Sequence, residues 1–174
     1  QTAAGLGGDV HYLKHTLTSS YHRLLWMDWI GNAVLRQGHI LGLGEDVGIN
    51  DRFFLGGSRL RGFEGGGVGP RDAVTGDSLG GNVFYSATAE ITVPLNLTKD
   101  FEIDAALFSD VGTLTALDDK GAEILDASSP RASVGVGFSY LSPFGPIRVD
   151  YARAVLKEDF DQTENFKFSF GATF

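Results

Sequence analysis

Residue types that commonly carry catalysis are present in this chain, but their spacing does not form a reactive site. The glycines between residues 65 and 69 resemble a phosphate-binding loop, yet the lysine and the hydroxyl residue of that motif are missing. Ser58 in the segment GGSRL fails the nucleophile-elbow pattern, because Leu60 stands where that pattern requires glycine. We therefore expect no nucleotide site, no cofactor and no enzymatic activity.

Residues that bind metals are also scattered along the sequence. The four histidines are His11, His15, His22 and His39. Their spacing is not typical of a metal site, so we expect them in the walls of strands or at strand ends. Asp118, Asp119 and Glu123 could hold calcium in a loop, although acidic loop residues are ordinarily solvated. The sequence predicts no metal centre.

Composition narrows the class of protein. The chain has 174 residues, of which 43% are apolar, a formal charge of −8 and no cysteine. It lacks a run of about 18 apolar residues, so only strands could carry it across a membrane. The 14 basic residues are scattered, which argues against a nucleic-acid partner. The chain starts at Gln1 without a methionine, and we expect it to be a mature or truncated piece.

The last nine residues, FKFSFGATF, have the pattern of a membrane-facing strand. One face carries Phe166, Phe168, Phe170, Ala172 and Phe174, and the other carries Lys167, Ser169, Gly171 and Thr173. A soluble sandwich could also end on an alternating edge strand, but it would not normally leave four phenylalanines on an unprotected edge. The pattern favours a strand of a transmembrane β-barrel.

The rest of the chain repeats this alternation between connections of unequal length. Further strands are expected over residues 83–95, 101–111, 131–140 and 147–152, and over about 9–21 and 30–43. Short connections at 96–100 and 142–146 alternate with long ones at 42–82, 114–130 and 157–165. Outer-membrane barrels have short periplasmic turns and long extracellular loops, so we expect a periplasmic C-terminus.

The number of strands indicates a larger barrel. About seven strands cannot close, because the smallest bacterial barrels have about eight. An open edge in lipid would leave backbone groups unpaired, at roughly several kcal/mol each. The predicted fold is therefore all-β, an antiparallel transmembrane β-barrel, with residues 1–174 as its C-terminal half and the other strands upstream.

A set of short motifs indicates which protein family the chain resembles. The motifs are FFLGG (53–57), LRGFE (60–64), GVGPRD (67–72), ATAEITVPL (87–95), FSDVGTL (108–114), SPFGPIRVDYA (142–152) and the terminal FKFSFGATF. In order and spacing they resemble the BamA family of outer-membrane β-barrel assembly factors, in the surface-antigen superfamily of outer-membrane insertases. The residues of the GVGPRD and SPFGPIRVDYA motifs are similar to those of the alphaproteobacterial members of this family.

The resemblance implies a role for the RGF motif, Arg61, Gly62 and Phe63. In that family the long loop, here 42–82, folds back into the barrel lumen, and its arginine meets acidic residues of the inner wall. Glu90 and Asp110 stand at the matching positions, and the alternation independently points both side chains inward. A guanidinium held by two carboxylates is a charge-assisted contact. The alternative is a solvated arginine in a surface loop.

The resemblance also implies a mechanism and partners. A barrel of about sixteen strands, with periplasmic repeats upstream, would insert and fold β-barrel proteins through a lateral gate beside the terminal strand. The terminal strand would also carry the signal that is recognised when this chain is itself assembled. The residues of the signal and of the gate would be Phe166, Phe168, Phe170, Gly171 and Phe174. Expected partners are the outer-membrane bilayer, nascent β-barrel clients and accessory assembly lipoproteins. The alternatives are a polypeptide-translocating pore of the two-partner secretion type and a diffusion porin, whose lumen a plugging loop would block.

Overall fold

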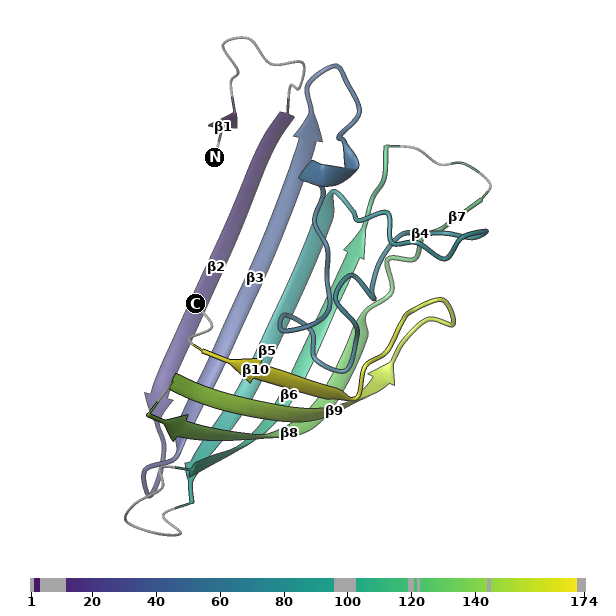
Figure 1. Cartoon of the computed structure of the whole chain (residues 1–174). Helices are drawn as coiled ribbons and strands as arrows, with labels where there is room; N and C mark the ends of the chain where they lie inside the picture. Colours follow the sequence, from purple (N-terminus) through teal and green to yellow (C-terminus); the bar gives the residue numbers. More distant parts are fainter. Residues whose placement is uncertain are drawn as a thin grey trace.

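A curved antiparallel sheet forms the framework of the protein (Figure 1). The computed structural model describes residues 2–3, 12–95, 103–118, 121, 123–143 and 145–171. In spatial order the sheet contains β1 (Thr2–Ala3), β2 (Tyr12–Leu24), β3 (Ile30–Gly42), β5 (Val83–Pro94), β6 (Ile103–Thr115), β8 (Arg131–Ser142), β9 (Gly145–Leu156) and β10 (Phe166–Phe170). The predicted all-β antiparallel fold is confirmed, and β2 to β10 of this sheet correspond to the seven predicted strands.

The convex face of the sheet is mostly apolar, as the alternation predicts. In β6, Leu107 is 62% exposed while its neighbour Phe108 is only 2% exposed. In β10, Phe166 and Phe168 are each 67% exposed. A continuous row of exposed apolar side chains is stable against lipid and unfavourable against water. Within the described part of the chain, no helix has the length and apolarity to cross a membrane.

The hydrophobic core lies between the concave face of the sheet and the β3–β5 connection. This connection is the long loop, which covers residues 43–82 because Gly42 is the last residue of β3. The sheet contributes Ile40, Phe84 and Leu114 to the core. The long loop contributes Val47, Phe53, Leu55, Leu60, Phe63 and Val68 to it. The rings of Phe53 and Phe84 meet edge to face, with centroids 4.7 Å apart. The long loop therefore packs against the sheet instead of extending into solvent.

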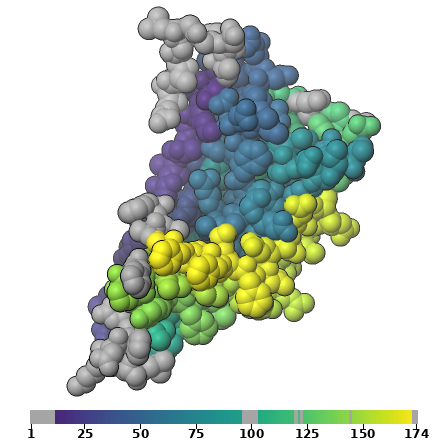
Figure 2. Space-filling view, viewed as in Figure 1, coloured from purple at the N-terminus to yellow at the C-terminus, as the bar shows by residue number. Residues whose placement is uncertain are grey.

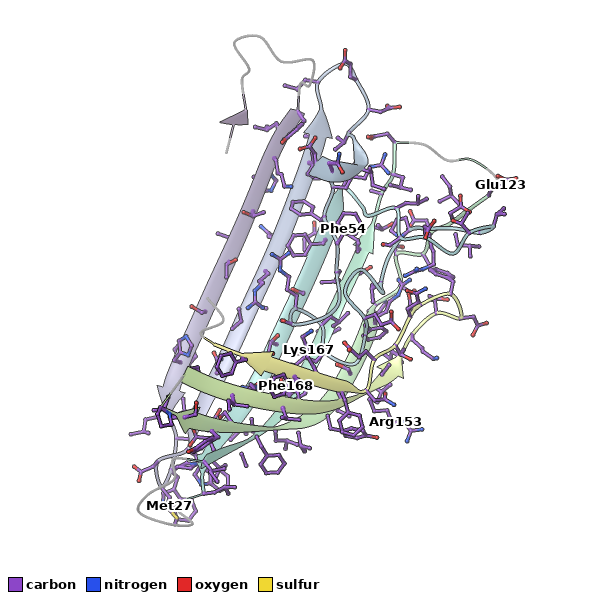
Figure 3. The ribbon with its side chains drawn as sticks, viewed as in Figure 1. Met27, Phe54, Glu123, Arg153, Lys167 and Phe168 are labelled. Carbon is purple, nitrogen blue, oxygen red and sulfur yellow. The ribbon has the colours of Figure 1, made fainter. Side chains whose placement is uncertain are left out.

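The long connections gather at one end of the strands. The 3-10 helix η1 (Ile49–Asp51) lies in the long loop, and β4 (Arg71–Asp72) of that loop pairs with β7 (Ile124–Leu125) of the β6–β8 connection. In Figure 3, Glu123 beside β7 and Met27 in the β2–β3 turn lie at opposite ends of the sheet. The β8–β9 connection contains only residues 143–144.

Several boundaries differ from the sequence prediction. β6 ends at Thr115 where 111 is predicted, and β9 covers Gly145–Leu156 where 147–152 is predicted. β2 extends past residue 21 to Leu24, because it pairs with β3 along its whole length. The sequence predicts a terminal strand over residues 166–174. β10 covers Phe166–Phe170, Gly171 adopts a left-handed φ of +88°, and residues 172–174 lie outside the described part of the chain. Phe174, His11 and Asp119 lie outside the described residues.

Candidate functional site

Arg61 of the long loop is bound to Asp110 of β6 by three hydrogen bonds. Its Nε donates to Oδ2 over 2.8 Å, its second terminal nitrogen donates to Oδ1 over 2.9 Å, and its backbone N–H donates to Oδ2 over 3.1 Å. The Asp110 side chain is 1% exposed and that of Arg61 is 8% exposed. The contact is a buried, bidentate, charge-assisted pair, which is the strongest arrangement of these two groups.

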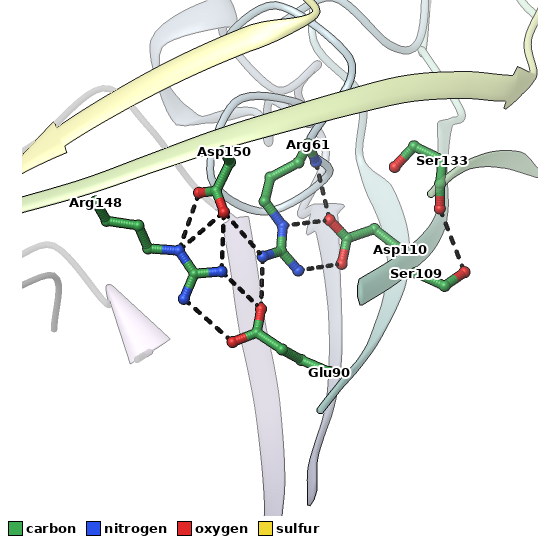
Figure 4. A network of polar contacts seen from close by, with 7 residues as sticks. All are labelled: Arg61, Glu90, Ser109, Asp110, Ser133, Arg148 and Asp150. Carbon is green, nitrogen blue, oxygen red and sulfur yellow. Dashed lines mark hydrogen bonds and ion pairs between the residues drawn. The ribbon is translucent and has the colours of Figure 1, made fainter. Parts of the chain in front are cut away.

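Two further strands complete a network around Arg61 (Figure 4). The remaining terminal nitrogen of Arg61 donates to Glu90 of β5 over 2.6 Å and lies 3.8 Å from Asp150 of β9. Arg148, also in β9, donates to both oxygens of Glu90 and to both oxygens of Asp150, over 2.9 to 3.1 Å. The network therefore joins the long loop to three strands.

An aromatic ring packs against the guanidinium of Arg61. The Cζ atom of Arg61 lies 3.4 Å from the ring centroid of Phe108, which is a cation–π contact. Gly135 of β8 makes room for this ring, since a Cβ there would lie 2.4 Å from Phe108. Gly137 likewise makes room for Asp150, whose carboxylate would lie 2.3 Å from a Cβ at that position. The inward glycines of β8 thus create the space that the network occupies.

Gly62 and Phe63 hold the loop on the other side of Arg61. Gly62 has a φ of +89°, and a Cβ there would lie 3.0 Å from Ser133 and 3.3 Å from the backbone nitrogen of Ala154. Phe63 is 1% exposed in the core. The RGF motif therefore combines a charged anchor, a residue that allows close approach to β8 and β9, and an apolar anchor.

The β9–β10 connection closes over the long loop. Backbone N–H groups of Glu64 and Glu164 donate to the carbonyls of Gln162 and Gly62, over 3.1 and 3.2 Å. Figure 2 shows this terminal segment, in yellow, directly beside the long loop, in blue and teal. A second buried pair, Arg131 with Asp161, at 2.9 Å, ties the connection to the start of β8. The β9–β10 connection is therefore bound both to the RGF segment of the long loop and to β8.

The network is suited to positioning and not to proton transfer. Burial lowers the pKa of Arg61, but the hydrogen bonds and charges of Asp110 and Glu90 outweigh this effect and raise the pKa above its ordinary value. All three carboxylates are bound by arginine. Among the described residues no group of three or more His, Cys, Asp or Glu side chains could hold a metal ion. The arrangement fixes a loop inside a curved sheet.

The structure brings together some of the residues singled out in the sequence. Arg61, Glu90 and Asp110 meet, whereas the terminal strand lies at the sheet edge with the side chains of Phe166, Phe168 and Phe170 on the convex face. Gly171 follows that strand, and its N–H donates to the carbonyl of Pro146 over 2.9 Å.

Sequence reasoning missed Arg148 and Asp150 as members of the network. Both residues have the inward parity of Glu90 and Asp110, and both lie in the SPFGPIRVDYA motif. Their signal was therefore available: a pair of opposite charges, two residues apart, on the concave face of a strand.

Comparison with known proteins identifies the family. A model of the Omp85 superfamily domain matches residues 1–174. The chain belongs to the Omp85 superfamily.

Two similar proteins have names that refer to assembly. The chain is 38% identical, over 173 residues, to outer membrane protein assembly factor BamA of Neorickettsia risticii, an alphaproteobacterium, and the match covers 98% of the chain and 23% of that protein. It is 34% identical over 97 residues to the sorting and assembly machinery component 50 homolog of Bos taurus, covering 55% of the chain and 20% of that protein.

A solved BamA structure has a similar fold. The crystal structure of BamA from Haemophilus ducreyi lacking POTRA domains 1–3 matches with a TM-score of 0.80 and 25% identity, over 94% of this chain and 35% of that one. The chain spans about a fifth to a quarter of the length of the Neorickettsia and Bos relatives. The predicted resemblance to BamA and to its alphaproteobacterial versions is confirmed.

Proposed function

We propose that this chain is the C-terminal part of the membrane barrel of an outer-membrane protein assembly factor. The whole protein would insert and fold β-barrel proteins into the bacterial outer membrane, without enzymatic chemistry or a cofactor. The observation that carries the proposal is the buried contact of Arg61 with Asp110 and Glu90, which fixes the long loop on the concave face of a BamA-like sheet. The names of the BamA and SAM50 relatives support the same function.

The proposed mechanism uses the terminal strand as one side of a lateral gate. β10 is an edge of the sheet, and five of its residues are paired with β9. The free edge of β10 would pair with the first strand of the barrel and so close a barrel of about sixteen strands. This pairing would open to let client strands add to the edge by β-augmentation. The residues of this gate would be Phe166, Phe168, Phe170, Gly171 and Phe174. The same residues would form the signal that is recognised when this chain is itself inserted into the membrane.

The proposed topology follows from the lengths of the connections. The long loop and the other long connections would lie outside the cell and in the lumen, and the C-terminus would be periplasmic. The partners would be the outer-membrane bilayer, nascent β-barrel clients and accessory assembly lipoproteins. The basic residues are dispersed over strands and loops, so no nucleic-acid partner is proposed.

A complementation experiment tests the proposal. Cells depleted of their own copy of the protein would receive the wild-type gene or its Arg61→Ala variant, and the amounts of folded outer-membrane barrels would be measured by heat-modifiable gel migration. We expect wild type to restore the barrels and Arg61→Ala to restore them poorly. Arg59→Ala is the matched control, because Arg59 is exposed two residues away and has no ion pair in the described residues.

The same cells separate the two classes of function. A secretion pore would leave folded barrels at their normal level on depletion and would reduce only the export of its exoprotein. That result would reject the assembly function. Loss of many unrelated barrels, before any loss of a single exported protein, is the expected result.

A further inference from the structure

The outward face of β2 and β3 carries a polar patch near the end of these strands that adjoins the long loop. His15 and His39 are direct cross-strand partners, and Gln37 lies two residues before His39 on the same face. Their outward neighbours Leu13, Leu17, Leu35 and Leu41 are all at least 40% exposed. Polar side chains on a lipid-facing surface are unfavourable unless they have a function or reach the interface. The patch lies on the face of the sheet opposite the one that packs against the long loop.

The two imidazoles are close enough to share one ligand. Their ring centroids are 5.6 Å apart and the rings are inclined by 80°. Two imidazoles bound to one tetrahedral ion, through metal–nitrogen bonds of about 2.0–2.1 Å, have ring centres roughly 5–6 Å apart. The observed separation of the ring centres lies in this range.

A hollow in the surface provides the space for an ion. A cavity of about 220 Å³ is lined by His15, Gln37, Gly38, His39, Val83 and Tyr85. Gln37 is opposite Tyr85 across the β3–β5 pair, and both residues line the same space as the imidazoles. Imidazole ligands with neutral oxygens suit Zn²⁺, Cu²⁺ and Ni²⁺ better than Ca²⁺ or Mg²⁺, which prefer carboxylates.

We propose that His15 and His39 form a binding site for a divalent transition-metal ion of the Zn²⁺, Cu²⁺ and Ni²⁺ group on the outer face of the barrel wall. The ion takes one nitrogen from each strand and completes its shell with water and with an oxygen of Gln37 or Tyr85. Because the ligands come from β2 and β3, the ion clips these two strands together. The site depends only on neighbouring strands of this chain and is independent of the proposed function.

Thermal unfolding with and without Zn²⁺ tests the site. The whole protein in nanodiscs, freed of metal, would be heated alone and with excess Zn²⁺. A ligand that binds only the folded state raises the unfolding temperature. We expect Zn²⁺ to raise it for wild type, and His15→Ala or His39→Ala to weaken Zn²⁺ binding by about tenfold or more, since each removes one of two imidazole ligands. His22→Ala is the matched control, because His22 pairs with Asn32 on the opposite face of the same strands.

A second measurement uses wild type alone, so it stands even if a histidine variant folds poorly. Diethylpyrocarbonate modifies accessible imidazoles, and mass spectrometry reports the modification at each histidine. We expect Zn²⁺ to protect His15 and His39 together and to leave His22 unchanged. Modification of His15 and His39 at the same rate with and without Zn²⁺ would overturn the proposal, as would an equal rise in unfolding temperature for wild type and both variants.

Discussion

At the scale of single residues, the charge balance of the network explains why its members depend on one another. Arg61 and Arg148 carry two positive charges, and Glu90, Asp110 and Asp150 carry three negative charges, so the network has a net charge of −1. Removing one arginine leaves buried carboxylates without compensation. Breaking a buried pair in this way costs on the order of 3–5 kcal/mol. Removing an arginine together with an acid should cost less.

This argument predicts a rescue between Arg148 and Asp150. Arg148→Ala changes the net charge of the network to −2 and deprives Glu90 and Asp150 of a partner. Asp150→Ala, added to it, restores the charge of −1. We expect the double variant to unfold at a higher temperature than Arg148→Ala alone, which a double-mutant cycle on the protein in detergent would measure. Additive losses from the two substitutions would show that charge balance does not hold the network together.

At the scale of elements, the shape of the long loop depends on glycines in two different situations. Gly62 has a left-handed φ, and a side chain there would press on β8 and β9. Gly65, three residues later, has open space around its Cβ position and no such φ. Alanine at each of the two positions therefore distinguishes the effect of close packing on stability from the effect of losing a flexible glycine.

We predict that Gly62→Ala destabilises the seated loop by about 1–3 kcal/mol, through backbone strain and contact with Ser133. Gly65→Ala should leave stability unchanged or raise it slightly, because it lowers the entropy of the unfolded chain. Limited proteolysis of the long loop would measure both effects. Equal susceptibility of the two variants would contradict the close approach of Gly62 to the sheet.

The sequence predicts the elements better than it predicts their contacts. Period-two alternation was enough to find the strands and to give Glu90 and Asp110 the same facing, because facing is a local property of a strand. The path of the long loop has no such period, and the resemblance alone suggested that it folds inward. The pair of Arg131 and Asp161 joins the first residue of β8 to the β9–β10 connection, 30 positions away in the sequence, so no local pattern could predict it.

His15 and His39 show the same limit at a different site. They are 24 positions apart in the sequence, and only the register of β2 with β3 brings them together. Their separation along the chain carries no metal-binding spacing. Gly171 is a related case, since alternation predicts a strand through it while its positive φ ends β10 at Phe170.

At the scale of the whole molecule, the two faces of the sheet have different surroundings. The convex face is mostly apolar, and the concave face carries the network and the long loop. Leu107, near the middle of β6, is 62% exposed on the convex face. Thr16 of β2 lines the concave side of the sheet. A charge introduced at these two positions should therefore have different effects.

We predict that Leu107→Arg lowers the free energy of unfolding in lipid vesicles by about 2–4 kcal/mol, since an arginine near the bilayer midplane is unfavourable. Thr16→Arg, the matched control, should change it little, because its side chain points away from lipid. Urea titrations of the protein in vesicles would give both values. A loss at Thr16 as large as the loss at Leu107 would reverse the proposed assignment of the faces.

The central claim is that Arg61 seats the long loop and that assembly activity depends on the seated loop. Because the chain has no cysteine, Val68→Cys would place a unique thiol of this chain at a loop position that is 0% exposed. Proteoliposomes with this thiol would be prepared alone and with Arg61→Ala or Arg59→Ala, and thiol labelling and client-barrel insertion would be measured in the same samples. We predict that Arg61→Ala speeds labelling and slows insertion together, while Arg59→Ala changes neither. Unchanged labelling in Arg61→Ala, or normal insertion with a freely labelled loop, would contradict the account.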